Sequence, residues 1–98
     1  MLPKKARLGA TEVREILKTG RSARVGGVSA KYVEASDARA AVVVSKKTAK
    51  TAVARNALRR RIYTTLDKTL PSRKHVVFFI QTNPFKTDDL VALCSRLS

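Results

Sequence analysis

A chain of 98 residues with 21 Lys and Arg against seven Asp and Glu carries a net charge of +14, an excess typical of proteins that bind nucleic-acid phosphates. The length fits a single domain with one modest core. One Cys and one His exclude an internal disulfide and a structural zinc site, which needs four ligands, and they fit a reducing compartment. The apolar runs are far shorter than the roughly 20 residues of a membrane-spanning helix. We therefore expect a soluble, cytoplasmic protein with a nucleic-acid partner and no membrane contact.

The first predicted element is a short helix at about residues 11–19. Thr11 offers an N-cap, and Gly20 predicts a left-handed end to the helix. The apolar stripe, at i, i+3 and i+4 spacing, consists of Val13, Ile16 and Leu17. The basic segment before this helix, residues 1–8, predicts a surface arm that either frays or contacts RNA.

Two strands are predicted next, at about residues 28–33 and 40–44. Gly26 and Gly27 break the chain before the first strand, in which side chains alternate with a period of two. The second strand is a continuous apolar run, and turn-forming residues at 35–38 separate the two. We expect the strands to pair as an antiparallel hairpin.

A long helix is predicted at about residues 51–69, ended by Pro71. Its buried stripe would consist of Leu58, Ile62, Thr65, Leu66 and Thr69. Residues 76–80 are apolar on both pleat faces, which predicts a strand in the middle of a sheet. Thr87 offers the N-cap of a last helix, in which Cys94 is a core residue. We therefore expect all 98 residues to form one α+β domain, a small mixed β-sheet packed with three helices as a two-layer α-β sandwich.

Positive charge is concentrated in residues 45–61, SKKTAKTAVARNALRRR. The basic residues of this segment are Lys46, Lys47, Lys50, Arg55, Arg59, Arg60 and Arg61. No acidic residue falls between Asp37 and Asp67. A helix face that is merely solvated gains from acid-base pairs at i, i+4, and this helix lacks them. The pattern therefore indicates a polyanionic partner.

The basic residues of the long helix do not all share one direction. At about 100° per residue, one polar face would carry Arg55, Asn56, Arg59, Arg60 and Tyr63. Arg61 points away, at about 240° from Arg55. The three lysines come before the helix, where a chain leaving the sheet offers backbone N–H groups to phosphates. Asn56 either bonds a base edge, a 2′-hydroxyl or a metal-bound water, or satisfies a nearby carbonyl group.

The stretch VVVSKKTAKTAVARNALRRR resembles the signature segment of the bacterial ribonuclease P protein component, most closely over residues 42–60. That pattern is a strand ending in Ser-Lys-Lys, a short spacer with Ala-Val, then Arg-Asn and a basic helix. Residues 13–20, VREILKTG, are similar to the first helix of the family and its terminal glycine. The resemblance implies a protein subunit of the enzyme that removes the 5′ leader from precursor tRNA. It also implies a left-handed strand-helix-strand crossover, against the usual right-handed preference.

The resemblance implies a division of labour in which the RNA subunit hydrolyses the phosphodiester with Mg²⁺ and the protein alone is not catalytic. The residues implied to contact the catalytic RNA are Lys46, Lys47, Lys50, Arg55, Asn56, Arg59 and Arg60. A leader cleft between the first helix and the sheet would be lined by Val13, Leu17, Tyr32 and Val44. The resemblance implies no metal site on the protein alone, and Asn56 is a candidate for contact with a metal-bound water. The implied partners are the catalytic RNA and precursor tRNA, with no DNA, and the protein would be monomeric in the complex.

The chain departs from the family pattern at several positions. Ala57 stands where the family usually has Arg, and Tyr63 where another Arg is common. Val13 and Leu17 stand where aromatic residues are common. Because stacking on an aromatic side chain contributes about 1–3 kcal/mol per base, leader binding should be weaker or rest on aliphatic contact.

Of three other functions, one is not separated from this one by composition and two are disfavoured. A structural RNA-binding protein, such as a small ribosomal protein, shares the size, charge and fold class. A stand-alone nuclease is disfavoured because His75 lies beside basic residues and an apolar strand, without a carboxylate cluster for two metals. A DNA-binding helix-turn-helix is disfavoured because the basic helix follows a strand rather than a partner helix.

Overall fold

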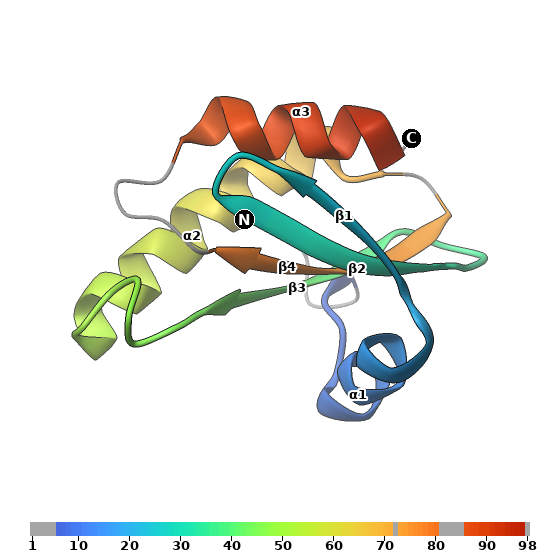
Figure 1. The fold of residues 1–98 in the computed structure, drawn as a ribbon, viewed down its shortest axis with the longest axis horizontal. Helices are drawn as coiled ribbons and strands as arrows, with labels where there is room; N and C mark the ends of the chain where they lie inside the picture. The colour runs from blue at the N-terminus through green and yellow to red at the C-terminus, as the bar shows by residue number, and fades with distance from the viewer. Residues whose placement is uncertain (1–5, 72, 81–85, 98) are drawn as a thin grey trace.

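The protein folds as a four-stranded sheet with three helices in a computed structural model that describes residues 6–71, 73–80 and 86–97. Its elements in chain order are α1 (Ala10–Thr19), β1 (Arg21–Val25), β2 (Val28–Glu34), β3 (Arg39–Val44), α2 (Ala52–Thr69), β4 (Lys74–Ile80) and α3 (Thr87–Leu97). The strand order is β1-β2-β4-β3, with β3 parallel to β4 and the other pairs antiparallel (Figure 1). The predicted α+β domain with a mixed sheet is confirmed.

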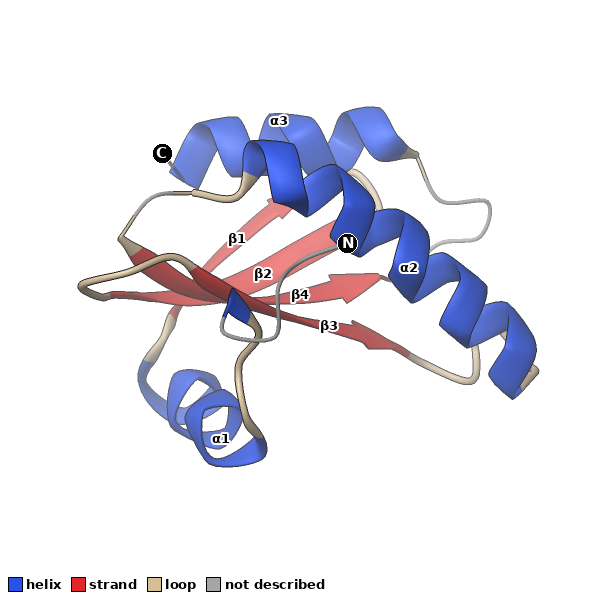
Figure 2. Ribbon diagram, turned by 180° about the vertical axis from the view of Figure 1, so that it is seen from behind, coloured by secondary structure: helices blue, strands red, loops and turns tan. Residues whose placement is uncertain are grey.

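Helices cover both faces of the sheet. Figure 2 shows α2 and α3 together on one side and α1 on the other. In β4, Val76 and Phe78 belong to the core that α2 and α3 cover, while Val77 between them is equally buried on the side of α1. The predicted two-layer arrangement therefore holds for α2, α3 and the sheet, and α1 adds a partial third layer.

The predicted hairpin between the second and third strands is wrong. β2 pairs with β4 along its whole length, from Val28 opposite Ile80 to Glu34 opposite Lys74, and β3 lies on the other edge of β4. Because β4 is apolar on both faces, it is most stable in the middle of the sheet, and this position separates β2 from β3. β3, α2 and β4 form the parallel crossover that the family resemblance implies, and its left-handedness stays a prediction.

β1 is a strand that the sequence pattern did not predict. Most of its residues are exposed, so it lacks the apolar alternation that identifies a half-buried strand. The two glycines form the turn of the β1–β2 hairpin, where Gly26 has φ +57°. A Cβ atom at Gly26 would lie 2.4 Å from the Asp89 carboxylate of α3. The backbone conformation favours glycine here, whereas the Asp89 carboxylate is the end of a flexible side chain that can rotate away.

The ends of α1 differ from the prediction. The helix begins one residue earlier, with Gly9 rather than Thr11 as its N-cap, and the Glu12 carboxylate accepts a hydrogen bond from the Gly9 N–H at 3.1 Å. Gly20 has φ −72°, so its conformation is extended rather than left-handed. A Cβ there would lie 2.5 Å from the carbonyl oxygen of Ile16, so the close approach of two backbones explains this glycine.

The later elements agree with the sequence pattern. The Thr51 hydroxyl accepts a hydrogen bond from the Ala54 N–H at 3.1 Å and caps α2. Ile62 and Leu66 of the predicted stripe are fully buried, and Cys94 of α3 is a core residue. None of the helices in the described ranges is both long and apolar enough to cross a membrane.

Candidate nucleic-acid interface

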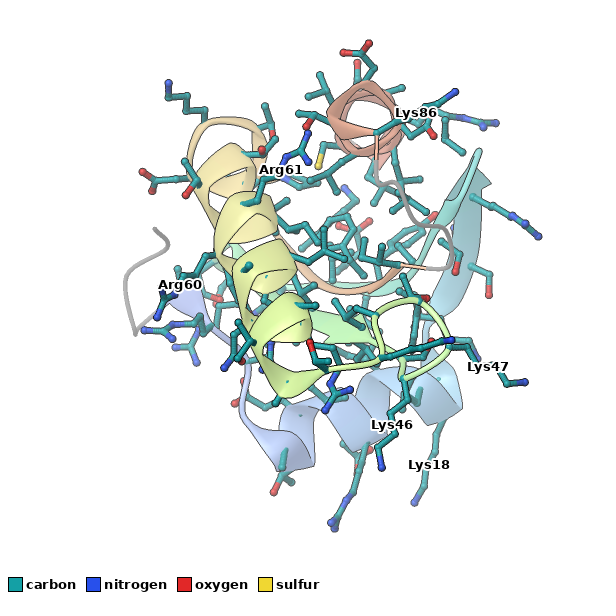
Figure 3. The ribbon with its side chains drawn as sticks, turned by 90° about the vertical axis from the view of Figure 1, so that its left-hand side faces the viewer. Lys18, Lys46, Lys47, Arg60, Arg61 and Lys86 are labelled. Atoms are coloured by element: carbon teal, nitrogen blue, oxygen red, sulfur yellow. The ribbon has the colours of Figure 1, made fainter. Side chains whose placement is uncertain are left out.

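The turn between β3 and α2 carries two lysines whose side chains extend into solvent. Thr48 is buried in this turn, and its hydroxyl donates a hydrogen bond to the carbonyl oxygen of Ile80 at 3.0 Å. Its N–H also contacts the Ser45 hydroxyl at 3.2 Å, which closes the turn. Lys46 and Lys47 are exposed at the tip and extend outward (Figure 3). A turn closed by hydrogen bonds therefore presents both ammonium groups to solvent.

The predicted polar face of α2 is present. Asn56, Arg59 and Arg60 are exposed, and Arg59 donates a hydrogen bond to the side-chain oxygen of Asn56. A hollow of about 380 Å³ lies beside this face. The hollow is lined by Arg7, Val42, Asn56, Arg59, Arg60 and Tyr63. The helical rotation of about 100° per residue thus placed these side chains correctly. Arg7, in the segment before α1, is an addition that the sequence pattern did not identify.

Arg55 behaves differently from the rest of the predicted face. One guanidinium nitrogen donates hydrogen bonds to the carbonyl oxygens of Ala49, at 3.1 Å, and Lys50, at 3.3 Å. The residue is half-buried, whereas Lys50 itself is exposed. Arg55 therefore joins the first turn of α2 to the preceding loop.

Arg61 lies on another side of α2, as its helical angle predicts. Its guanidinium donates a hydrogen bond to the Thr87 hydroxyl of α3 at 3.4 Å. Figure 3 shows Arg60 and Arg61 leaving α2 in different directions. The charge of Arg61 consequently lies between two helices rather than on the polar face.

The four residues predicted to line a leader cleft lie on two different faces. Val13 and Leu17 belong to α1, and Leu17 is 39% exposed. Tyr32 and Val44 pack against the core cluster on the side of α2 and α3. Because successive strand residues point to opposite faces, it is their neighbours that lie toward α1. The structure does not bring Tyr32 and Val44 together with the two α1 residues.

The face of the sheet beside α1 carries an open groove of about 380 Å³. Its lining includes Ser22, Arg24, Ser29, Lys31 and Phe79. Arg24, Ser29, Phe79 and Val43 follow one another across the four strands in register. The Lys31 ammonium donates to the carbonyl oxygen of Leu17 at 3.2 Å, which places Lys31 at the border of α1. Phe79 was not predicted as a surface aromatic residue, because only the strand register shows which face of the sheet it lies on.

A chain of polar contacts fastens α1 to the sheet. The Arg39 guanidinium contacts Glu12 of α1 at 3.5 Å and Asp37 at 2.9 Å. The other oxygen of Asp37 lies 2.7 Å from the ring nitrogen Nε2 of His75 in β4. Hydrogen bonds from His75 and then from Arg39 hold the pKa of the Asp37 carboxyl below its ordinary value. His75 therefore belongs to a structural contact at the starts of β3 and β4.

Metal-binding side chains do not gather in the parts of the chain that the structure describes. Over residues 6–71, 73–80 and 86–97, no three His, Cys, Asp or Glu side chains lie close enough together to hold an ion. Cys94 is buried, and this burial raises the pKa of its thiol although a hydrogen bond with Thr69 acts in the opposite direction. The exposed chemistry of the described residues is thus dominated by cations.

Comparison with known proteins agrees with this geometry. A family model described as Ribonuclease P matches residues 2–97. The fold is similar to that of the RNase P protein from Thermotoga maritima, with a TM-score of 0.81 and 18% identity over 94% of this chain and 97% of that one. A Staphylococcus aureus RNase P protein mutant with defective mRNA degradation activity gives a TM-score of 0.76 and 20% identity over 96% of this chain and 86% of that one. A further structure of the S. aureus protein gives a TM-score of 0.69 and 17% identity over 94% and 91%.

The two kinds of comparison support different statements. At these identities the solved structures show a shared fold, and a search of curated protein sequences found no match. The family model covers nearly all of the chain. The chain therefore belongs to the ribonuclease P protein family and is the protein subunit of that ribonucleoprotein endoribonuclease of tRNA processing.

Proposed function

We propose that α2 and the turn before it bind the catalytic RNA of ribonuclease P, while the face of the sheet beside α1 binds the 5′ leader of precursor tRNA. One observation carries the proposal. Lys46, Lys47, Arg59 and Arg60 are all exposed, and none of them forms an ion pair with a described residue. The ion pairs found among described residues lie at Glu12, Glu34 and Asp37, away from α2. Family membership favours this function over that of a ribosomal protein.

The predicted RNA-binding residues take different roles in this proposal. Lys46 and Lys47 contact phosphates from a turn closed by hydrogen bonds, and exposed Lys50 adds charge beside them. Asn56, Arg59 and Arg60 contact the RNA directly. Arg55 holds the loop that carries the lysines, through its bonds to two loop carbonyls. A positioned set of cations, rather than diffuse charge, would then fix the register of the RNA.

The proposed leader site combines α1 with the groove beside it. Val13 and Leu17 supply aliphatic contact, as the family resemblance suggests, and Phe79 supplies an aromatic ring on the same side of the sheet. Arg24 and Lys31 lie in the same groove and would contact the leader phosphates. Tyr32 and Val44 lie on the opposite face, so Phe79 rather than Tyr32 is the proposed aromatic contact of the leader.

The proposed chemistry belongs to the RNA subunit with Mg²⁺. The described residues offer no carboxylate cluster for the metal, and the side-chain oxygen of Asn56 is engaged by Arg59. The protein contributes by neutralising phosphates where RNA and substrate meet, which lowers the Mg²⁺ concentration needed for cleavage. We further propose one protein per complex and a cytoplasmic place of action, where precursor tRNA is made.

The test is reconstitution of the holoenzyme. The full chain is added to the ribonuclease P RNA encoded in the same genome, and cleavage of a 5′-extended precursor tRNA is measured at low Mg²⁺. We expect a higher cleavage rate than with RNA alone, and tighter binding of precursor tRNA than of mature tRNA. The proposed function fails if the chain changes neither quantity. Phe79→Leu, which keeps an apolar side chain without an aromatic ring, should reduce the preference for precursor over mature tRNA.

A further inference from the structure

The segment before α1 brings a third arginine, beside Arg59 and Arg60, to the hollow on the polar face of α2. The Leu8 N–H donates a hydrogen bond to the carbonyl oxygen of Ala40 at 2.9 Å, and Arg7 forms a parallel bridge with Ala40. This pairing holds the segment along the outer edge of β3. From there the guanidinium carbon of Arg7 lies 6.0 Å from the centre of the Tyr63 ring. Arg7 therefore reaches α2 although about fifty positions separate the two in the chain, and an arginine over an aromatic face is itself a favourable contact.

The open hollow that these side chains line is large enough for more than a phosphate group. Its volume is about 380 Å³, within the range of roughly 300–1,000 Å³ found for small-molecule sites. Val42, which is 7% exposed, belongs to its lining. Tyr63, packed against the core on one side, supplies an aromatic wall. A site for phosphate alone would need neither the volume nor the ring.

The polar groups of the hollow are almost all donors. The Nε atom of Arg7 is buried and has no hydrogen-bond partner among the described residues. Arg59 occupies the side-chain oxygen of Asn56, so the amide NH₂ of Asn56 remains as a donor. No carboxylate belongs to the lining. A buried donor without a partner is destabilising, so the occupant that fits is anionic and rich in acceptors.

An acceptor-rich anion with a flat apolar surface is a nucleotide. A phosphate matches the guanidinium groups of Arg59 and Arg60, since such pairs form parallel hydrogen bonds. A nucleobase matches the outer face of the Arg7 guanidinium, because unpaired RNA bases stack on such planes, and the Tyr63 ring supports this guanidinium from its other side. Base carbonyl and ring-nitrogen acceptors match the donors of Asn56 and Arg7. We infer that this hollow binds one unpaired nucleotide of the RNA partner, an inference that rests on the proposed binding of the catalytic RNA by α2.

The first test compares two substitutions of Tyr63 in the full chain. Tyr63→Phe keeps the ring, and Tyr63→Leu keeps an apolar side chain without it. Affinity for the ribonuclease P RNA encoded in the same genome should stay within about 2-fold for Tyr63→Phe and fall about 5- to 150-fold for Tyr63→Leu, the range that base stacking gives. Arg7→Lys, at a site outside the core, keeps the charge but removes the planar fork, and it should also weaken binding. Thermal melts of each variant identify any loss that comes from unfolding.

The second test separates a nucleotide from a phosphate. Ultraviolet irradiation of the complex should crosslink the peptide that contains Tyr63 to one position of the RNA. An abasic residue at that position should weaken binding of the wild-type chain and leave binding of Tyr63→Leu unchanged. If the abasic RNA binds the wild-type chain as tightly as normal RNA does, the hollow holds a phosphate only and the inference is overturned.

The outcomes also distinguish this inference from the function on which it rests. If the wild-type chain binds the RNA and stimulates cleavage while Arg7→Lys and Tyr63→Leu behave like the wild type, the nucleotide site is wrong and the proposed function stands. If the wild-type chain neither binds the RNA nor stimulates cleavage, both are wrong.

Discussion

Arg55 and Arg59 are one helical turn apart in α2, yet removing Arg55 should lower stability and removing Arg59 should weaken RNA binding. Arg55→Ala deletes the two hydrogen bonds to the carbonyl oxygens of Ala49 and Lys50. A net contribution of about 0.5–1.5 kcal/mol for each bond, reduced because one of the two is solvent-exposed, gives a loss of about 1 kcal/mol in unfolding free energy. For a domain of this size, that loss lowers the Tm by about 4–8 °C.

Arg59→Ala should leave stability nearly unchanged and act on RNA binding. The side chain is exposed, and within the described residues it bonds only to exposed Asn56. Substitutions of this kind change the unfolding free energy by less than about 0.5 kcal/mol. If Arg59 contacts an RNA phosphate, its loss should reduce the slope of log K against log salt concentration by about 0.7–0.9.

Two measurements on the same variants check this contrast. Circular dichroism gives the Tm, and fluorescence anisotropy of labelled ribonuclease P RNA gives the affinity across a series of KCl concentrations at constant Mg²⁺. Lys68→Ala is the matched control, since Lys68 is an exposed cation of α2 whose helical angle lies about 220° from Arg55. If Arg55→Ala keeps the wild-type Tm and flattens the salt dependence as much as Arg59→Ala does, the proposed division between a loop-holding and an RNA-binding arginine is wrong.

Three further predictions concern stability and reactivity. Gly20→Ala should lower the unfolding free energy in urea titrations by about 1–3 kcal/mol, the range for overpacking. The reason is that the added Cβ would lie 2.5 Å from the Ile16 carbonyl oxygen. An unchanged urea midpoint would contradict this close approach. Asp37→Asn should destabilise the protein at neutral pH, and the difference from the wild type should disappear as the pH falls below 3.8, the ordinary pKa of the carboxyl group. The lowered pKa of Asp37 in the folded protein stabilises the fold above that pH, and this stabilisation is lost on acidification. Equal urea midpoints for variant and wild type at neutral pH would refute this. Cys94 should react with a thiol-specific reagent only as fast as the protein unfolds around it, because burial raises the pKa of its thiol and keeps the reagent out. Rapid reaction without denaturant would show that α3 is not packed as described.

The positions of the helices and the directions of most α2 side chains were predictable from the sequence, whereas the ends of α1 and the strand partners were not. The period of 3.6 residues placed α2 correctly and separated Arg61 from Arg60, because a helix fixes the direction of every side chain from its neighbours alone. Strand pairing depends on distant segments, so the local turn chemistry between β2 and β3 favoured a hairpin that the central position of β4 excludes. β1 was missed because an edge strand with mostly exposed residues lacks an apolar pattern.

In the candidate site, too, the residues on the helix were predictable and those placed by strand pairing were not. Residues of the α2 face followed from rotation about the helix axis, whereas Arg7 joined them only through its pairing with the edge of β3. Tyr32 and Val44 lie on the face of the sheet away from α1, and the sequence did not reveal this because strands with apolar or mixed residues on both sides do not show which face lies toward α1. Arg55 shares the predicted face of the helix, but its long side chain turns back to the loop, and no backbone angle determines such a turn.

The most direct measurement of RNA binding by α2 is the rate of precursor tRNA cleavage at limiting Mg²⁺ by the RNA with three forms of the protein. These are the wild-type chain, a variant with both Arg59→Ala and Arg60→Ala, and Lys68→Ala. We expect the wild-type chain and Lys68→Ala to raise the rate equally and the double variant to lose most of the gain, with a Tm close to that of the wild type. Equal rates for the double variant and the wild type would contradict the assignment of the α2 face to RNA binding.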